Sequence, residues 1–95
     1  MSGYRPDIRA RAAEVIRHLP PDLKRAIRAA IRLLCENPAA GEPLRHELEG
    51  RFKYRVRRFR IIYRLDRKRR ILYVIAIGHR RSIYEEIAAR EEPGK

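Results

Sequence analysis

Basic residues are concentrated in the second half of this sequence, where they alternate with apolar residues. Between Arg51 and Arg81 the only acidic residue is Asp66, and most of the basic residues are arginines. Arginine presents a planar fork of donors that matches the geometry of a phosphate group and can stack on a base. Like charges repel one another, so a fold gains no stability by gathering them on one sheet. We therefore predict that this segment binds the phosphodiester backbone of a nucleic acid.

The spacing of these cations predicts which of them share a surface. In the segment 52–57 every second residue is apolar, which is the pattern of a strand with one buried face and one charged face. The cations that alternation can place on one face of two neighbouring strands are Lys53, Arg55, Arg57, Arg60 and Arg64. An alternative interpretation is the solvated face of an amphipathic sheet without a ligand. An ordinary solvated face mixes both signs of charge, whereas this one is nearly all positive.

Helices in the first half and strands in the second half are expected to position these residues. Apolar residues recur at helical spacing up to Asn37-Pro38, and the period changes to two near Arg51. Asp7 is the expected N-cap of the first helix. The fold is predicted to be α+β, with an N-terminal antiparallel helical hairpin packed on a small antiparallel β-sheet and a short C-terminal helix. The expected helices are about 7–18, 21–36 and 82–90, and the expected strands about 51–57, 60–66 and 70–77.

The chain as a whole is small and strongly basic. Its 95 residues predict a single domain, 1–95, and 24 Lys and Arg against 12 Asp and Glu give a formal net charge of +12. Cys35 is the only cysteine, so an intramolecular disulfide cannot form. No apolar run approaches the ~20 residues of a membrane span, and the N-terminus lacks the apolar core of a secretory signal. We therefore expect a cytoplasmic protein with no membrane partner.

Several short motifs, taken in order, resemble those of one bacterial family, the RelE/ParE toxins of type II toxin–antitoxin systems. No single motif is diagnostic, but the ordered set covers nearly the whole chain. One departure is that the family opens with a clear β-strand, whereas Pro6 lacks an N–H donor here, so we expect that strand to be stunted or absent. The motifs are Leu19-Pro20-Pro21, Asn37-Pro38, Pro43-Leu44, Leu48-x-Gly50, Lys53-Tyr54-Arg55-Val56, Phe59 to Asp66 and Ile77 to Tyr84.

In the mRNA-cleaving branch of that family, the resemblance implies roles for matching residues. Lys53 and Arg55 match a basic pair that activates the 2′-hydroxyl and binds phosphate, and Arg60 matches an arginine that stabilises the transition state. Arg57 and Arg64 are expected to bind substrate, as is Arg81. The two remaining matches are a late arginine and a tyrosine that stacks on or orients the substrate: Arg80, with Arg81 as its rival, and Tyr84.

A related sub-branch implies a different path for the proton. There a Glu before Pro-Leu acts as base and a late His as acid, and this chain carries Glu42-Pro43-Leu44 and His79 at those places. Cleavage of RNA by its own 2′-hydroxyl needs a proton acceptor, a proton donor and cations around a dianionic phosphorane. The expected products are a 2′,3′-cyclic phosphate and a 5′-hydroxyl, formed without a metal or other cofactor. The sequence leaves the choice of base and acid open.

The favoured function is that of a toxin which cleaves mRNA as a ribosome-dependent endoribonuclease. One alternative is a ParE-like inhibitor of DNA gyrase, a branch that generally lacks the full set of basic and acid–base residues. Another is a nucleic-acid-binding module without catalysis, because binding and cleavage use the same cations. The expected partners are a cognate antitoxin, with which the chain would form a hetero-oligomer, the ribosome and mRNA.

Overall fold

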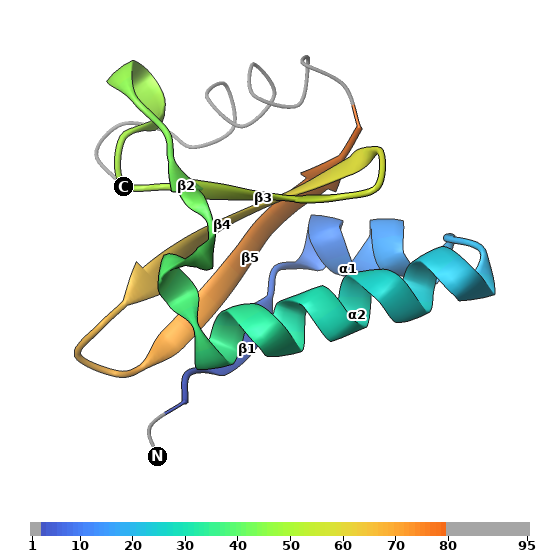
Figure 1. The fold of residues 1–95 in the computed structure, drawn as a ribbon, viewed down its shortest axis with the longest axis horizontal. Helices are drawn as coiled ribbons and strands as arrows, with labels where there is room; N and C mark the ends of the chain where they lie inside the picture. The colour runs from blue at the N-terminus through green and yellow to red at the C-terminus, as the bar shows by residue number, and fades with distance from the viewer. Residues whose placement is uncertain (1–2, 80–95) are drawn as a thin grey trace.

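The computed structural model describes residues 3–79, which form two helices and a five-stranded mixed sheet (Figure 1). The strands lie in the order β1-β5-β4-β3-β2, with β1 parallel to β5 and the other pairs antiparallel. The elements are β1 (Arg5–Ile8), α1 (Ala10–Arg17), α2 (Pro21–Glu36), a 3-10 turn η1 (Pro38–Ala40), β2 (Glu42–Pro43), a second 3-10 turn η2 (His46–Leu48), β3 (Phe52–Val56), β4 (Phe59–Asp66) and β5 (Ile71–Gly78).

The predicted N-terminal helical hairpin on an antiparallel sheet is wrong, because a strand precedes both helices and makes the sheet mixed. β1 forms despite its proline because it is an edge strand. The backbone N–H groups of Arg5 and Arg9 donate to carbonyls on the β5 side, at 2.9 and 3.0 Å. Alternation therefore turns the nitrogen of Pro6 toward the open edge, where no donor is needed. Asp7, the expected helix cap, lies in this strand, and the predicted C-terminal helix falls outside the described residues.

The two helices pack side by side on one face of the sheet (Figure 1). α2 spans the predicted residues 21–36, with Pro21 in its first turn, where a missing N–H donor has no consequence. α1 begins at Ala10, about three residues later than predicted, because β1 takes up the residues before it. None of the helices in residues 3–79 is long and apolar enough to cross a membrane.

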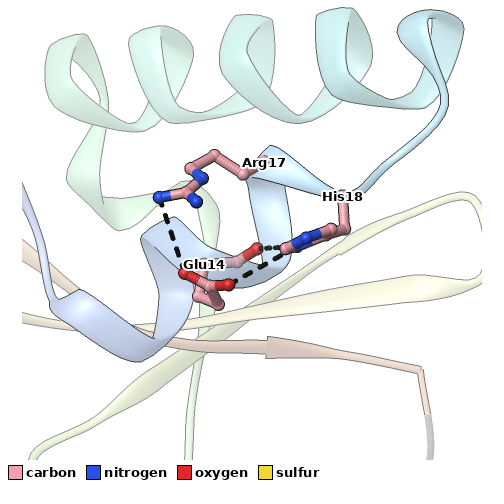
Figure 2. Close-up of polar contacts among 3 residues, drawn as sticks. All are labelled: Glu14, Arg17 and His18. Carbon is pink, nitrogen blue, oxygen red and sulfur yellow. Dashed lines mark hydrogen bonds and ion pairs between the residues drawn. The ribbon is translucent and has the colours of Figure 1, made fainter.

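The outer surface of α1 carries a small ionic group that stands apart from the sheet. The carboxylate of Glu14 lies 3.7 Å from Arg17 and 3.6 Å from His18, whose ring nitrogen is also 3.0 Å from the Glu14 carbonyl (Figure 2). The side chains of all three are more than half exposed. His18 is therefore an exposed surface residue. Exposed ion pairs of this kind contribute at most about 1 kcal/mol to stability.

Strand alternation gives the sheet two different faces. Its inner face packs against the helices and forms the main core, with Ile61, Tyr63 and Val74 buried against residues such as Ile27 and Leu34. The outer face holds a smaller apolar cluster, in which Leu44 and Leu48 pack over three buried residues of β4 and β5. Those three are Ile62, Ile75 and Ala76.

β5 is an interior strand, whose nearly unbroken apolar run suits burial on both faces, and lies between β1 and β4. Its register against β4 shifts after Ile62, which pairs with Ala76, whereas the next residue, Tyr63, pairs with Val74. Ile75 is therefore the extra residue of a bulge, and bulges redirect the side chains that follow them. This shift allows the adjacent residues Ile75 and Ala76 both to join the outer cluster.

Candidate functional site

The register of β2, β3 and β4 gathers the predicted catalytic residues on the outer face of the sheet. Glu42 pairs with Lys53, and Arg55 pairs with Arg60. Residues directly opposite one another in antiparallel strands project to the same face, and Lys53 and Arg55 are two residues apart on one strand. Lys53 and Arg60 therefore share a face, which is the geometric condition for a common site.

A shallow hollow of about 350 Å³ lies over these strands. In it the Nζ of Lys53 stands 3.6 Å from Oε1 of Glu42, a pair in which the Lys53 side chain is 38% exposed and the Glu42 side chain 75% exposed. A contact this open leaves both groups accessible to a ligand and adds little to stability. The residues lining the hollow are Ala40, Glu42, Lys53, Tyr54, Arg55 and Arg60.

A second hollow, of about 390 Å³, adjoins the first and shares Arg55 and Arg60 with it. Its other lining residues are Arg58 and His79. β5 brings His79 to this place, because Gly78 pairs with Arg60 and His79 follows it. The imidazole stands edge-on to the ring of Phe59, with the ring centroids 5.1 Å apart and an interplanar angle of 77°. The two hollows therefore share Arg55 and Arg60, with Glu42 and Lys53 lining one of them and His79, whose ring packs against Phe59, lining the other.

A backbone carbonyl of the neighbouring β3–β4 turn holds the side chain of Arg55. The Arg55 Nε donates a hydrogen bond to the carbonyl of Arg57 at 3.2 Å. Arg57 lies outside β3 in the β3–β4 turn, with a left-handed φ of 57°, and is exposed. The prediction that Arg57 continues the charged face of the strand is therefore wrong, because the chain reverses before alternation reaches it. Arg58 is in the same turn, between the strands predicted at about 51–57 and 60–66.

Arg64 is on the outer face of β4 but belongs to a different cluster. Its guanidinium carbon lies 4.3 Å from the centroid of the Tyr73 ring, and the guanidinium carbon of Arg9 lies 5.5 Å from the same centroid. Guanidinium groups over an aromatic face are held by the ring quadrupole. Burial lowers the pKa of the Arg51 guanidinium, and the nearby charge of Arg64 lowers it further. Positive charge therefore extends along this face beyond the two hollows.

Three predicted site residues, Arg80, Arg81 and Tyr84, lie outside the described residues, and the structure does not place them. It brings together the other five catalytic candidates, Glu42, Lys53, Arg55, Arg60 and His79. Among the substrate-binding candidates, neither Arg57 nor Arg64 lines either hollow.

Sequence reasoning missed one contact beneath the site. The hydroxyl of Tyr63 accepts a hydrogen bond from the Gly41 N–H at 3.0 Å and donates one to the Pro38 carbonyl at 2.7 Å. Both partners lie just before Glu42 in the chain. Tyr63 is 22 residues beyond Gly41, so local spacing carries no signal for this contact. The glycine directly before Glu42 is the only hint in the sequence.

The sequence of this chain is similar to those of known toxins. Residues 4–84 match the family model described as the ParE toxin of a type II toxin–antitoxin system, parDE. Toxin RelG of Mycobacterium tuberculosis is 35% identical over 68 residues, a match that covers 70% of this chain and 78% of the relative.

Solved structures of similar shape extend the comparison. A chain of the RelBE2 toxin–antitoxin complex from Mycobacterium tuberculosis has a TM-score of 0.77 and 30% identity, with 84% of this chain and 94% of that chain covered. A mutant of toxin RelE from E. coli in the free state has a TM-score of 0.73 at 20% identity, with 92% of each chain covered, and so shows the likeness of fold.

Proposed function

This chain belongs to the ParE toxin family of type II toxin–antitoxin systems, and from that premise we propose that it is a ribosome-dependent endoribonuclease that cleaves mRNA. One observation carries the proposal. Two arginines, Arg55 and Arg60, lie at the junction of two hollows, with a carboxylate and an ammonium group at one side and an imidazole at the other. Cations, a proton acceptor and a proton donor are the groups that this cleavage requires.

The arrangement suits an in-line displacement at phosphorus. With the scissile phosphate bound to Arg55 and Arg60, the 2′-oxygen attacks from the side of Glu42 and Lys53, and its proton passes to a base there. The bond from phosphorus to the 5′-oxygen breaks on the opposite side, where His79 gives that oxygen a proton. The products are a 2′,3′-cyclic phosphate and a 5′-hydroxyl. Arg55 and Arg60 stabilise the charge that develops on the phosphorane oxygens.

In this proposal Glu42 is the base, and Lys53 is the cation beside it. The two groups are 3.6 Å apart, so the ammonium group of Lys53 lies directly beside the proposed base. A carboxylate accepts a proton readily, whereas an ammonium group must first lose one. Lys53 then contributes positive charge to the side where the attacking oxygen becomes negative.

In this proposal the ribosome orients the nucleotide for the reaction, because the open surface of the toxin does not. Both hollows are only partly enclosed by the described residues, so these residues alone do not surround a flexible nucleotide. Holding the 2′-oxygen, phosphorus and leaving oxygen in line can contribute many orders of magnitude to a rate. A ribosome that grips the message in its decoding site would provide this orientation.

The test is primer extension on a translated message, with the purified chain added in the presence and in the absence of ribosomes. We expect breaks within the message only when ribosomes are present, and 2′,3′-cyclic phosphate ends at those breaks. Equal cleavage with and without ribosomes would contradict ribosome dependence, and 5′-phosphate products would contradict attack by the 2′-hydroxyl.

A second candidate function is inhibition of DNA gyrase, which the match to a ParE family model favours. It calls for no acid–base pair, and so leaves the placing of Glu42 and His79 beside the arginines unexplained. A supercoiling assay with purified gyrase separates the two. Loss of supercoiling activity, together with an intact message on translating ribosomes, would replace the endoribonuclease proposal.

We also propose a cognate antitoxin as the resident partner. The net charge of +12 destabilises the compact state by self-repulsion, which an acidic partner would screen. Solved relatives include chains of toxin–antitoxin complexes. Pull-down of the chain from its native host should recover the product of an adjacent gene. Recovery of ribosomes alone, across replicate conditions, would count against this pairing.

A further inference from the structure

The hydroxyl of Tyr63 joins the core to the segment that carries Glu42. The Tyr63 residue is fully buried, and its ring stacks on Phe52 with 5.3 Å between the centroids. The hydroxyl leaves this apolar environment only to reach the backbone of Pro38 and Gly41. It accepts from one and donates to the other, so both its donor and an acceptor position are used. A buried hydroxyl bonded in this way fixes the position of both backbone groups.

Gly41 is adapted to this contact by its small size. A side chain there would collide with the Tyr63 hydroxyl and with the Lys53 carbonyl oxygen, which an ideal Cβ would approach to 2.8 Å. The Gly41 φ is −84°, a value that any residue adopts, so conformational freedom is not the reason for glycine. Close approach of the loop to β3 and β4 is the reason.

The next residue along the chain is the candidate base. Glu42 begins β2, which is only two residues long and is held to the sheet by β3 alone. So short a strand forms few hydrogen bonds, and its position depends also on the residues that flank it. After β2, the Leu44 N–H donates to the Arg51 carbonyl; before it, the chain needs an anchor of its own. The anchor is the pair of hydrogen bonds to Tyr63, which hold Gly41, directly before Glu42, and Pro38, at the start of the same loop.

We propose that the Tyr63 hydroxyl is a positioning group for the reaction: it fixes the Pro38–Gly41 loop against the sheet and thereby holds the Glu42 carboxylate beside Lys53. The inference rests on the proposed function, because it assigns Glu42 the role of base. Burial raises the pKa of Tyr63, so its hydroxyl keeps its proton and remains a donor to Pro38 under the conditions of the reaction. The ring fills the core, whereas the hydroxyl oxygen alone contacts the loop.

The test is Tyr63→Phe, which removes the oxygen and keeps the ring. We expect the catalytic rate on ribosomes to fall about 10- to 100-fold with KM little changed, because misplacing a catalytic group by about an ångström has effects of that size. Tyr4→Phe, which removes another hydroxyl from a ring packed at the core, should leave the rate unchanged. A wild-type rate for Tyr63→Phe would overturn the proposal.

A double-mutant comparison separates positioning from general damage. Once Glu42→Gln has removed the base, Tyr63→Phe should have almost no further effect on the rate, because the group that it positions is gone. Multiplicative losses in the double variant would mean that Tyr63 acts on something other than Glu42, and the proposal would fail.

Amide hydrogen exchange tests the anchor without any catalysis. In Tyr63→Phe, the amide of Gly41 should exchange at least about 10-fold faster than in the wild type, while core amides such as that of Val74 keep their protection. Unchanged exchange at Gly41 would contradict the anchor. If the wild type does not cleave RNA but Gly41 exchange responds as expected, the endoribonuclease proposal fails while the anchoring of Glu42 stands.

Discussion

The same strands give the sheet an inner face that packs in the core and an outer face that carries exposed cations. On β4, Ile61 and Tyr63 point inward and are fully buried, whereas Arg60 and Arg64, on either side of this pair in the chain, point outward. The inner residues are close-packed against two helices. The outer cations line open hollows or cover an aromatic ring. Residues that pack in the core and residues that line the candidate site are therefore neighbours on the same strand.

The two faces should respond differently to substitution. Removing atoms from a packed interior costs transfer energy and leaves a cavity. Removing an exposed cation from a surface of like charge costs little, and relieves repulsion. Stability should therefore depend on the inner face and activity on the outer face, and each of the following predictions either breaks this division or refines it.

The largest expected effect on stability is on the inner face. Ile61→Ala should lower the free energy of unfolding by about 2–5 kcal/mol, since Ile61 is fully buried and its loss leaves a cavity. Denaturant unfolding measures the change. Its control is Arg60→Ala, the preceding residue on the opposite face, which should change stability by no more than about 0.5 kcal/mol. Similar losses for the two variants would show that the faces do not divide in this way.

The next effect is on catalysis and belongs to the outer face. Arg60→Ala should slow cleavage on ribosomes by about 100-fold or more, the usual result of losing one preorganised donor to a transition state. Arg67→Ala is the matched control, because Arg67 is an exposed arginine of the β4–β5 turn that lines neither hollow. Primer extension on a translated message compares the two variants, and equal rates would remove Arg60 from the site.

A smaller effect concerns pH and returns to the inner face. Burial raises the pKa of Tyr63 above its ordinary value of 10.0, so the unfolded chain loses this proton first as pH rises. The stability that the protonated Tyr63 hydroxyl contributes is complete below about pH 10. Above that pH the free energy of unfolding declines by at most about 1.4 kcal/mol per pH unit, until the pKa of Tyr63 in the folded state is reached. Urea unfolding at alkaline pH should show a gentler decline for Tyr63→Phe. Parallel declines would contradict the shift.

The smallest effect tests whether the outer face is uniform. Arg64 lies in the Tyr73 cluster and lines neither hollow. Arg64→Ala should therefore raise KM a few-fold and leave kcat unchanged, the signature of a lost contact with the substrate backbone. The salt dependence of binding should weaken by about one phosphate contact. A fall in kcat comparable with that of Arg60→Ala would extend the catalytic site along β4.

Periodicity in the sequence predicted the strands that carry the site. The change of period near Arg51 placed β3, β4 and β5 to within one or two residues, and alternation correctly placed Lys53 and Arg55 on the same face as Arg60. These signals are local, because the identity of each residue reports the side that it faces. The prediction for Arg57 was wrong because alternation does not reveal where a strand ends and the chain turns.

The features that sequence analysis missed depend on contacts between distant residues. β1 contains a proline and two exposed residues, so only its pairing with β5 makes it a strand. Glu42 and Lys53 meet because a two-residue strand folds back on β3, and no periodicity extends over two residues. The bonds from Tyr63 to the loop join residues more than 20 positions apart.

The proline of β1 has a counterpart at the far edge of the sheet. β1 and β2 are the two edge strands, and each contains a proline, Pro6 and Pro43. The N–H of Leu44 donates to the carbonyl of Arg51, the residue before β3, at 2.8 Å, so the nitrogen of Pro43, like that of Pro6, faces outward. Exposed strand edges serve as templates on which other chains assemble into fibrils. Each edge of this sheet lacks a donor where a new strand would have to attach, and this hinders polymerisation of the chain through its sheet.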